Sequence, residues 1–96
     1  MLLDFYIDPE TGEPHIYQHG VNEKEVAEVL SGDGLRWHAG NEKWCVVGKT
    51  GTGRILQIIF IQVEQPSETT FVITAYPPKK DLATAYRRRM KKKGKR

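Results

Sequence analysis

Apolar and polar positions change their spacing several times along the 96-residue chain. Short apolar or alternating runs predict strands over residues 2–7, 35–38, 43–49, 54–63 and 69–76. The fourth run holds Ile58-Ile59-Phe60-Ile61, which is apolar on both faces. Such a run is typical of a central strand covered on two sides. The glycine-rich "TGTG" between the third and fourth runs predicts a hairpin connection.

Helical spacing is expected in two segments before the second predicted strand. Residues 15–19 fit about one helical turn ahead of Gly20. The clearer helix follows Asn22, which can cap it, while Glu25 three residues later completes a capping box. Gly32 is expected to end this helix in a left-handed conformation. Its core-facing side is predicted to consist of Val26, Val29 and Leu30.

A last helix is predicted after Pro77 and Pro78, which end the fifth strand because proline cannot donate to a ladder. Asp81 is the expected N-cap. One apolar stripe recurs every four residues at Leu82, Tyr86 and Met90.

The order β, α, β, β, β, β, α predicts an α+β domain. We expect a small, mostly antiparallel sheet of four to five strands, with an N-terminal helix pair and a C-terminal helix. Residues 1–86 are predicted to form the single domain, and residues 87–96 the basic end of the last helix and a tail.

The net charge of +3 conceals two regions of opposite sign. Residues 1–86 carry seven basic residues against 12 acidic ones, a net charge of −5, whereas residues 87–96 carry eight basic residues and no acid. Such an arm suits a polyanion or an acidic protein partner, and the alternative is a solvated helix end. No apolar run approaches the length of a membrane span, and the acidic N-terminus is unlike a signal peptide. The single cysteine, Cys45, fits a cytoplasmic protein.

Two histidines offer acid–base chemistry near neutral pH. His15 and His19 are four residues apart and share one face if the segment is helical. They could also begin a zinc site, but no third ligand stands at a suitable spacing, so no metal is expected.

Three longer stretches resemble the BrnT and RelE-like superfamily of small ribonuclease toxins. They are "QHGVNEKEVAEVL", "GKTGTGRILQIIF" and "VITAYPPKKDLATAY", and the resemblance spreads over about residues 4–86. It implies a RelE/BrnT-like fold and an endoribonuclease that needs neither metal nor other cofactor, because the 2′-hydroxyl of the RNA is the nucleophile. It also implies a small antitoxin protein that holds the enzyme inactive.

The resemblance also implies roles for individual residues. Arg54, after the hairpin glycine, would bind a phosphate. Tyr76 would donate a hydrogen bond to a phosphate or stack on a base. His15, His19 and Lys79 complete the expected catalytic set. The residues expected to bind RNA are Lys49, Lys80, Arg87 and Arg88. Antiparallel pairing of the last two strands is expected to bring Tyr76 and Arg54 to the same end of the sheet.

Two other functions fit the same pattern. The first is a non-catalytic interaction module whose basic arm holds an acidic protein or nucleic acid. The second is nucleic-acid binding through the arm without cleavage, which the acidic body disfavours because it repels phosphates.

Overall fold

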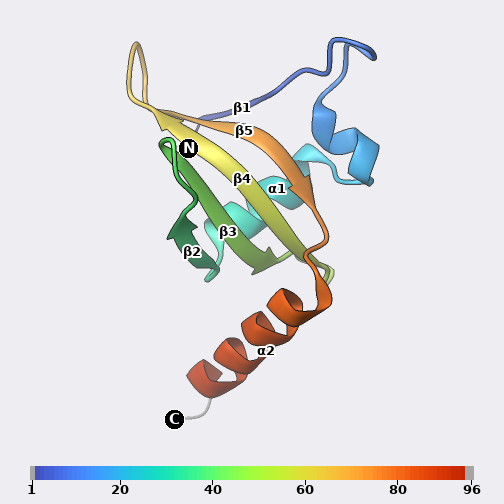
Figure 1. The fold of residues 1–96 in the computed structure, drawn as a ribbon, viewed down its shortest axis with the longest axis vertical. Helices are drawn as coiled ribbons and strands as arrows, with labels where there is room; N and C mark the ends of the chain where they lie inside the picture. The colour runs from blue at the N-terminus through green and yellow to red at the C-terminus, as the bar shows by residue number, and fades with distance from the viewer. Residues whose placement is uncertain (1, 95–96) are drawn as a thin grey trace.

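A computed structural model describes residues 2–94 and contains one five-stranded sheet with helices before and after it (Figure 1). The strand order is β1-β5-β4-β3-β2; β1 runs parallel to β5 and all other neighbours are antiparallel. The predicted α+β class with a mostly antiparallel sheet is therefore confirmed. The elements are β1 Leu2–Phe5, the 3-10 turn η1 His15–His19, α1 Glu23–Ser31, β2 Leu35–His38, β3 Lys43–Lys49, β4 Ile55–Val63, β5 Thr69–Tyr76 and α2 Lys80–Gly94.

The apolar strand β4 lies at the centre of the sheet, as its sequence predicts. Side chains alternate between the faces of a strand, so Ile58 and Phe60 share one face, while Ile59 and Ile61 share the other. Ile58 and Phe60 are buried in the main core. Ile59 and Ile61 are only partly buried. The two faces of the sheet are therefore covered to different extents.

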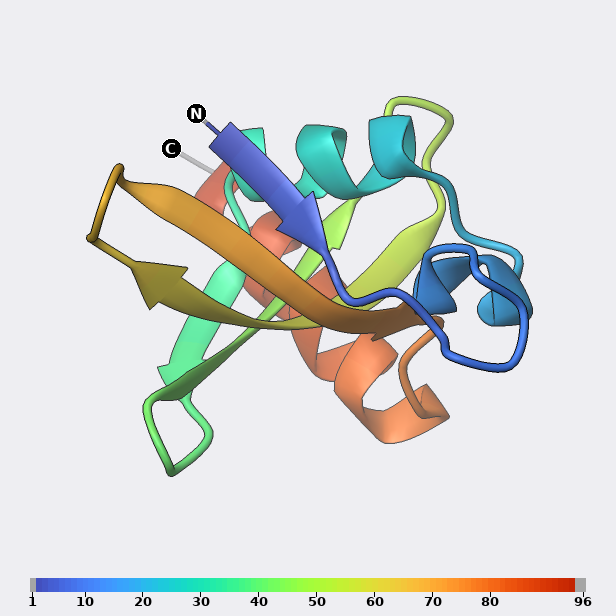
Figure 2. The same ribbon diagram turned by 90° about the horizontal axis from the view of Figure 1, so that it is seen from above.

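The helices lie on opposite sides of the sheet (Figure 2). α1 packs Val26, Val29 and Leu30 into the main core. α2 makes a smaller cluster in which Tyr86 lies with Val47 and Ile55. α2 then runs away from the sheet along the long axis of the molecule (Figure 1). It continues without a break through residue 87, where the sequence analysis places the end of the domain.

No helix within residues 2–94 is long and apolar enough to cross a membrane.

The predicted N-terminal helix pair is not confirmed. Residues 15–19 form a single 3-10 turn, which ends where Gly20 adopts a left-handed conformation with φ of 69°. Only α1 is an α-helix in this region. Its predicted capping box is confirmed: the Asn22 side chain accepts from the Glu25 backbone N–H at 2.9 Å, and the Glu25 carboxylate accepts from the Asn22 N–H at 3.2 Å.

Three boundary predictions are wrong. Gly32 is extended, with φ of −97°, because the chain continues straight toward Gly34 instead of turning back. Only glycine fits at position 34, since a Cβ there would lie 2.7 Å from Cγ2 of Val46. α2 begins at Lys80, so Asp81 lies inside its first turn. The first strand ends at Phe5, and Ile7 makes only an isolated bridge to Pro14.

One buried hydroxyl leads to a stability prediction. Oγ1 of Thr74 is shielded from solvent and has no hydrogen-bond partner among the described residues. Thr74→Val removes this unsatisfied group while nearly keeping the shape, so we expect stabilisation by about 1 kcal/mol. Urea unfolding measures it. Thr50→Val is the matched control: the Thr50 hydroxyl accepts from the Arg54 N–H at 3.1 Å, so its loss should destabilise. A Thr74→Val variant less stable than the wild type would contradict the interpretation that the Thr74 hydroxyl lacks a hydrogen-bond partner.

Candidate functional site

Four aromatic rings from three parts of the chain follow one another beside the end of β5. We call Tyr6, His15, His19 and Tyr76 the ring series. Successive ring centroids are 6.1 Å, 5.4 Å and 5.7 Å apart, and each pair meets edge to face. The 3-10 turn places both histidines in the middle of the series. The prediction that His15 and His19 share a face is therefore confirmed, and Tyr76 joins them.

Asp8 orients the first histidine of the series. Its carboxylate oxygen Oδ2 lies 3.2 Å from Nδ1 of His15 and also accepts from the amide of Gln18. The other oxygen accepts from the Glu10 backbone N–H at 2.9 Å. Because an ionised carboxylate only accepts, Nδ1 of His15 carries the hydrogen in this contact, and in the neutral ring Nε2 is then the nitrogen with the lone pair. This is the arrangement of a histidine that acts as a base.

The same contacts lower the pKa of Asp8 below its ordinary value of 3.8, chiefly through the Glu10 N–H and then through His15, against an opposing effect of burial. The unfolded chain therefore binds this proton first as the pH falls, so the carboxylate stabilises the fold at neutral pH and that stabilisation is lost as pH drops through the folded pKa. When the pH is lowered from about 5, where the Asp8 carboxyl is ionised, to about 3, the Asp8→Asn variant should lose less stability than the wild type. Urea unfolding at both pH values tests this. Asp4→Asn, at an exposed position of β1, is the control and should follow wild type.

Tyr76 closes the ring series at the C-terminal end of β5. It pairs with Gln57 near the start of β4, so the expected placement of Tyr76 and Arg54 at one end of the sheet is confirmed. Burial raises the pKa of the Tyr76 phenol, and nearby Cys45 adds to the effect. The phenol therefore stays protonated and is suited to donate a hydrogen bond to an anionic group.

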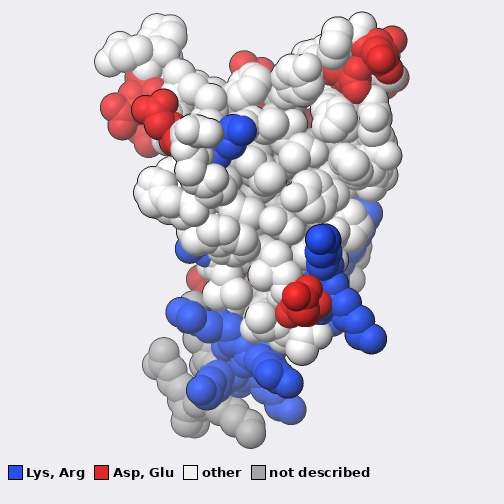
Figure 3. Space-filling view, in the orientation of Figure 1, with Lys and Arg blue, Asp and Glu red and all other residues white. Residues whose placement is uncertain are grey.

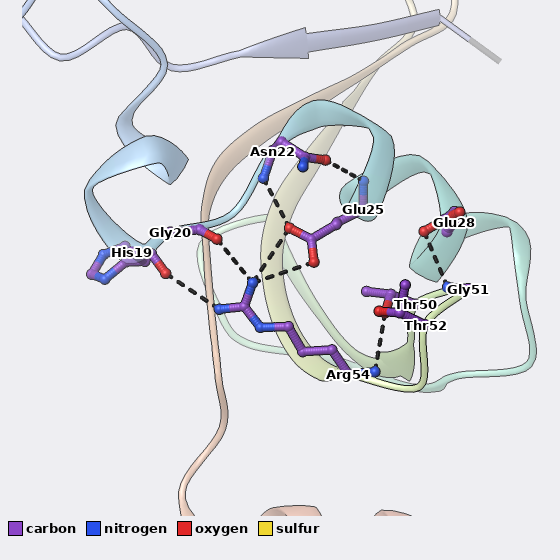
Figure 4. A network of polar contacts seen from close by, with 9 residues as sticks. All are labelled: His19, Gly20, Asn22, Glu25, Glu28, Thr50, Gly51, Thr52 and Arg54. Carbon is purple, nitrogen blue, oxygen red and sulfur yellow. Dashed lines mark hydrogen bonds and ion pairs between the residues drawn. The ribbon is translucent and has the colours of Figure 1, made fainter.

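Arg54 lies beside the backbone of His19 and Gly20, and its guanidinium is bound by groups of its own chain (Figure 4). Its Nη1 donates to the Gly20 carbonyl at 2.8 Å and pairs with the Glu25 carboxylate at 3.3 Å. Its Nη2 lies 3.5 Å from the His19 carbonyl oxygen. We call these contacts the Arg54 clamp. It connects the capping box of α1 to the backbone that carries His19. The phosphate role of Arg54 stays a prediction.

The predicted cations are spread along α2 and the sheet end beside it. Lys79 precedes α2 and Lys80 begins it, and the ammonium groups of both make no ion pair with any residue in the described part of the chain. Lys49 is exposed at the end of β3, and Arg87 and Arg88 are exposed on α2. None of these side chains has a hydrogen bond to the ring series among residues 2–94.

Sequence reasoning missed Asp8 and Tyr6. Both lie at the edges of a proline- and glycine-rich loop, where neither helical nor strand spacing signals a partner. Their contacts arise because the loop folds back: the His15 N–H donates to the Tyr6 carbonyl at 2.9 Å, and the Asp8 N–H to the Glu13 carbonyl at 2.8 Å. A search for carboxylates near each histidine would have suggested Asp8 among several candidates.

Within residues 2–94, no group of three or more His, Cys, Asp or Glu side chains is arranged to hold a metal ion. Cys45 is a buried free thiol on β3. No protein-family model, no curated protein and no solved structure matches this chain.

Proposed function

We propose that the chain is a metal-independent endoribonuclease of the RelE/BrnT-like toxin type. The observation that carries the proposal is the ring series with Asp8, which places two imidazoles and a protonated phenol side by side at one end of the sheet. RNA cleavage by its own 2′-hydroxyl needs a base, an acid and a donor for the phosphate, and these three side chains supply them. The resemblance of the three motif stretches to the superfamily supports the same reaction.

In the proposed reaction, Nε2 of His15 removes the proton from the 2′-hydroxyl, and the 2′-oxygen attacks the adjacent phosphorus. The bond from phosphorus to the 5′-oxygen breaks, and His19 donates a proton to that oxygen. The products are a 2′,3′-cyclic phosphate and a 5′-hydroxyl. Tyr76 donates a hydrogen bond to the phosphate, while the cations at the α2 end (Lys49, Lys79, Lys80, Arg87 and Arg88) hold the flanking RNA backbone.

The test is cleavage of a defined RNA by the purified protein in the presence of EDTA. We expect new fragments that carry 2′,3′-cyclic phosphate ends, identified by mass spectrometry, and slowed growth with RNA loss when bacteria express the protein. An RNA with 2′-O-methyl groups at the cut sites serves as the control and should stay intact. Undamaged RNA together with normal growth would reject the proposal.

A non-catalytic interaction module is the second candidate, and the Arg54 clamp is the observation that favours it. Both terminal nitrogens of Arg54 already have protein acceptors, so the cation assigned to the phosphate also has a structural role. Intact RNA combined with tight binding of an acidic partner would favour this candidate over the enzyme.

A further inference from the structure

Beyond the corner that α2 covers, no helix formed by residues 2–94 lies over the side of the sheet opposite α1 (Figures 1 and 2). We call this surface the open face and define it by four side chains: Trp37, Ile59, Ile61 and Phe71. Ladder register places Phe71 beside Ile61, and Ile59 in one row with Cys45 and Trp37. Ile59, Ile61 and Phe71 are partly buried and belong to neither core cluster, and Trp37 is 36% exposed.

The composition of the open face is unusual for a sheet surface that meets water. When one face of an antiparallel sheet packs on the core and the other meets water, apolar and polar residues normally alternate along each strand, so the solvated face is polar. Two of the outward positions of β4 are isoleucines, Ile59 and Ile61. Phe71 lies on one side of Ile61 and the exposed Lys43 on the other, while Trp37 lies two strands away from Ile59. Aromatic residues are enriched at protein interfaces, and grouped apolar side chains at a surface mark interaction sites.

Charged side chains are distributed unevenly around the open face. In Figure 3, which has the orientation of Figure 1, acidic side chains gather at the two upper corners and most basic side chains at the lower end. Mostly uncharged atoms cover the middle, with one basic side chain between the two acidic corners. The lower end is α2, whose only acid is Asp81. Its exposed cations are Lys80, Arg87, Arg88, Arg89, Lys91 and Lys92. A partner that covers the middle and continues downward must therefore be acidic at its lower end.

We propose that the open face and α2 together bind a segment of a partner protein that is apolar at one end and acidic at the other. The apolar side chains cover Ile61 and Phe71, and the carboxylates meet the cations of α2. RNA fits this surface less well, because the acidic corners repel phosphates on either side of the apolar middle. The proposal does not depend on RNA cleavage, since the ring series is not part of this surface. It shares only the α2 cations Lys80, Arg87 and Arg88 with the RNA-binding residues of the proposed function.

The experiment selects binders from a random peptide library displayed on phage, with the purified protein as bait. We expect the selected peptides to combine apolar residues with Asp and Glu. Their amide chemical-shift changes in NMR spectra should map to β3, β4, β5 and α2. Ile61→Ser together with Phe71→Ser should weaken binding at least about tenfold, the loss typical of central interface anchors. Ile7→Ser is the matched control, since Ile7 is 49% exposed on another segment, and should bind like wild type.

Three results would overturn the proposal. The first is peptides without acidic residues, or peptides whose shifts map elsewhere. The second is a wild-type dimer in light scattering that the Ile61 and Phe71 changes convert to monomer, since the occupant would then be a second copy. The third is shift changes on the open face with a short RNA oligonucleotide in place of peptide. Because binding is measured without cleavage, failure here leaves the proposed function untouched, and the reverse also holds.

Discussion

His19→Gln is expected to lower RNA cleavage by about 10²–10⁴-fold, the contribution of a well-placed general acid or base. Glutamine retains hydrogen-bonding groups of similar reach but cannot exchange a proton near neutral pH. His19 is exposed on the 3-10 turn, so its loss removes little packing. Cleavage rates with a single RNA, measured alongside the thermal midpoint, separate lost chemistry from lost folding.

His38→Gln is the matched control for this prediction. His38 is also exposed, and its ring lies 3.8 Å from the Trp44 ring by centroids, on β2 at the far edge of the sheet. It is outside the ring series, so its change should leave cleavage near the wild-type rate. Equal losses in the two variants would remove His19 from the mechanism, and unchanged cleavage in both would move the chemistry away from the ring series.

The strands could be predicted because the spacing of apolar residues within each strand shows which of its side chains are buried. The bounds of β2, β3 and β5 match the predicted runs, since each carries its own apolar or alternating pattern. The capping box was predictable for a similar reason: Asn22 and Glu25 are three residues apart, and their contacts need no distant partner.

Features that depend on distant parts of the chain were not predictable. The parallel pairing of β1 with β5 joins Leu3 to Thr70, and no local pattern signals it. The same is true of Asp8 beside His15 and of the contact between Arg54 and the His19 carbonyl, which require the folded loop and sheet together. Gly32 was mispredicted because the close approach of Gly34 to β3, and not the helix end itself, sets the path of the chain.

Arg54→Ala is expected to lower both stability and cleavage. The change removes the donor to the Gly20 carbonyl and the partner of the Glu25 carboxylate, whose side chain is 17% exposed. A charge-assisted hydrogen bond contributes about 1.5–3 kcal/mol, and we expect a loss near the lower value because the guanidinium is partly exposed. For a domain of this size, each kcal/mol lowers the thermal midpoint by about 4–8 °C, so differential scanning calorimetry resolves the change.

Arg54→Lys decides what the guanidinium does for cleavage. If a positive charge at the phosphate is what matters, lysine should restore much of the rate that alanine loses. If the Arg54 clamp positions His19, lysine should fail, because a single ammonium cannot reproduce the planar fork that reaches two carbonyls and a carboxylate. Given the contacts with Gly20 and His19, we expect lysine to fail and the His19 ring signals in NMR spectra to shift in both variants.

Glu25→Gln completes the test, because its amide oxygen can still accept from the Asn22 N–H and keep the capping box. The change removes only the charge that faces Arg54. If the Arg54 clamp positions His19, Glu25→Gln should lower the cleavage rate modestly by itself. The double variant with Arg54→Ala should then lose less activity than the sum of the two single losses, since both changes act through one contact. Additive losses would show that Arg54 and Glu25 act separately, and the guanidinium would then be assigned to the phosphate, as the resemblance implies.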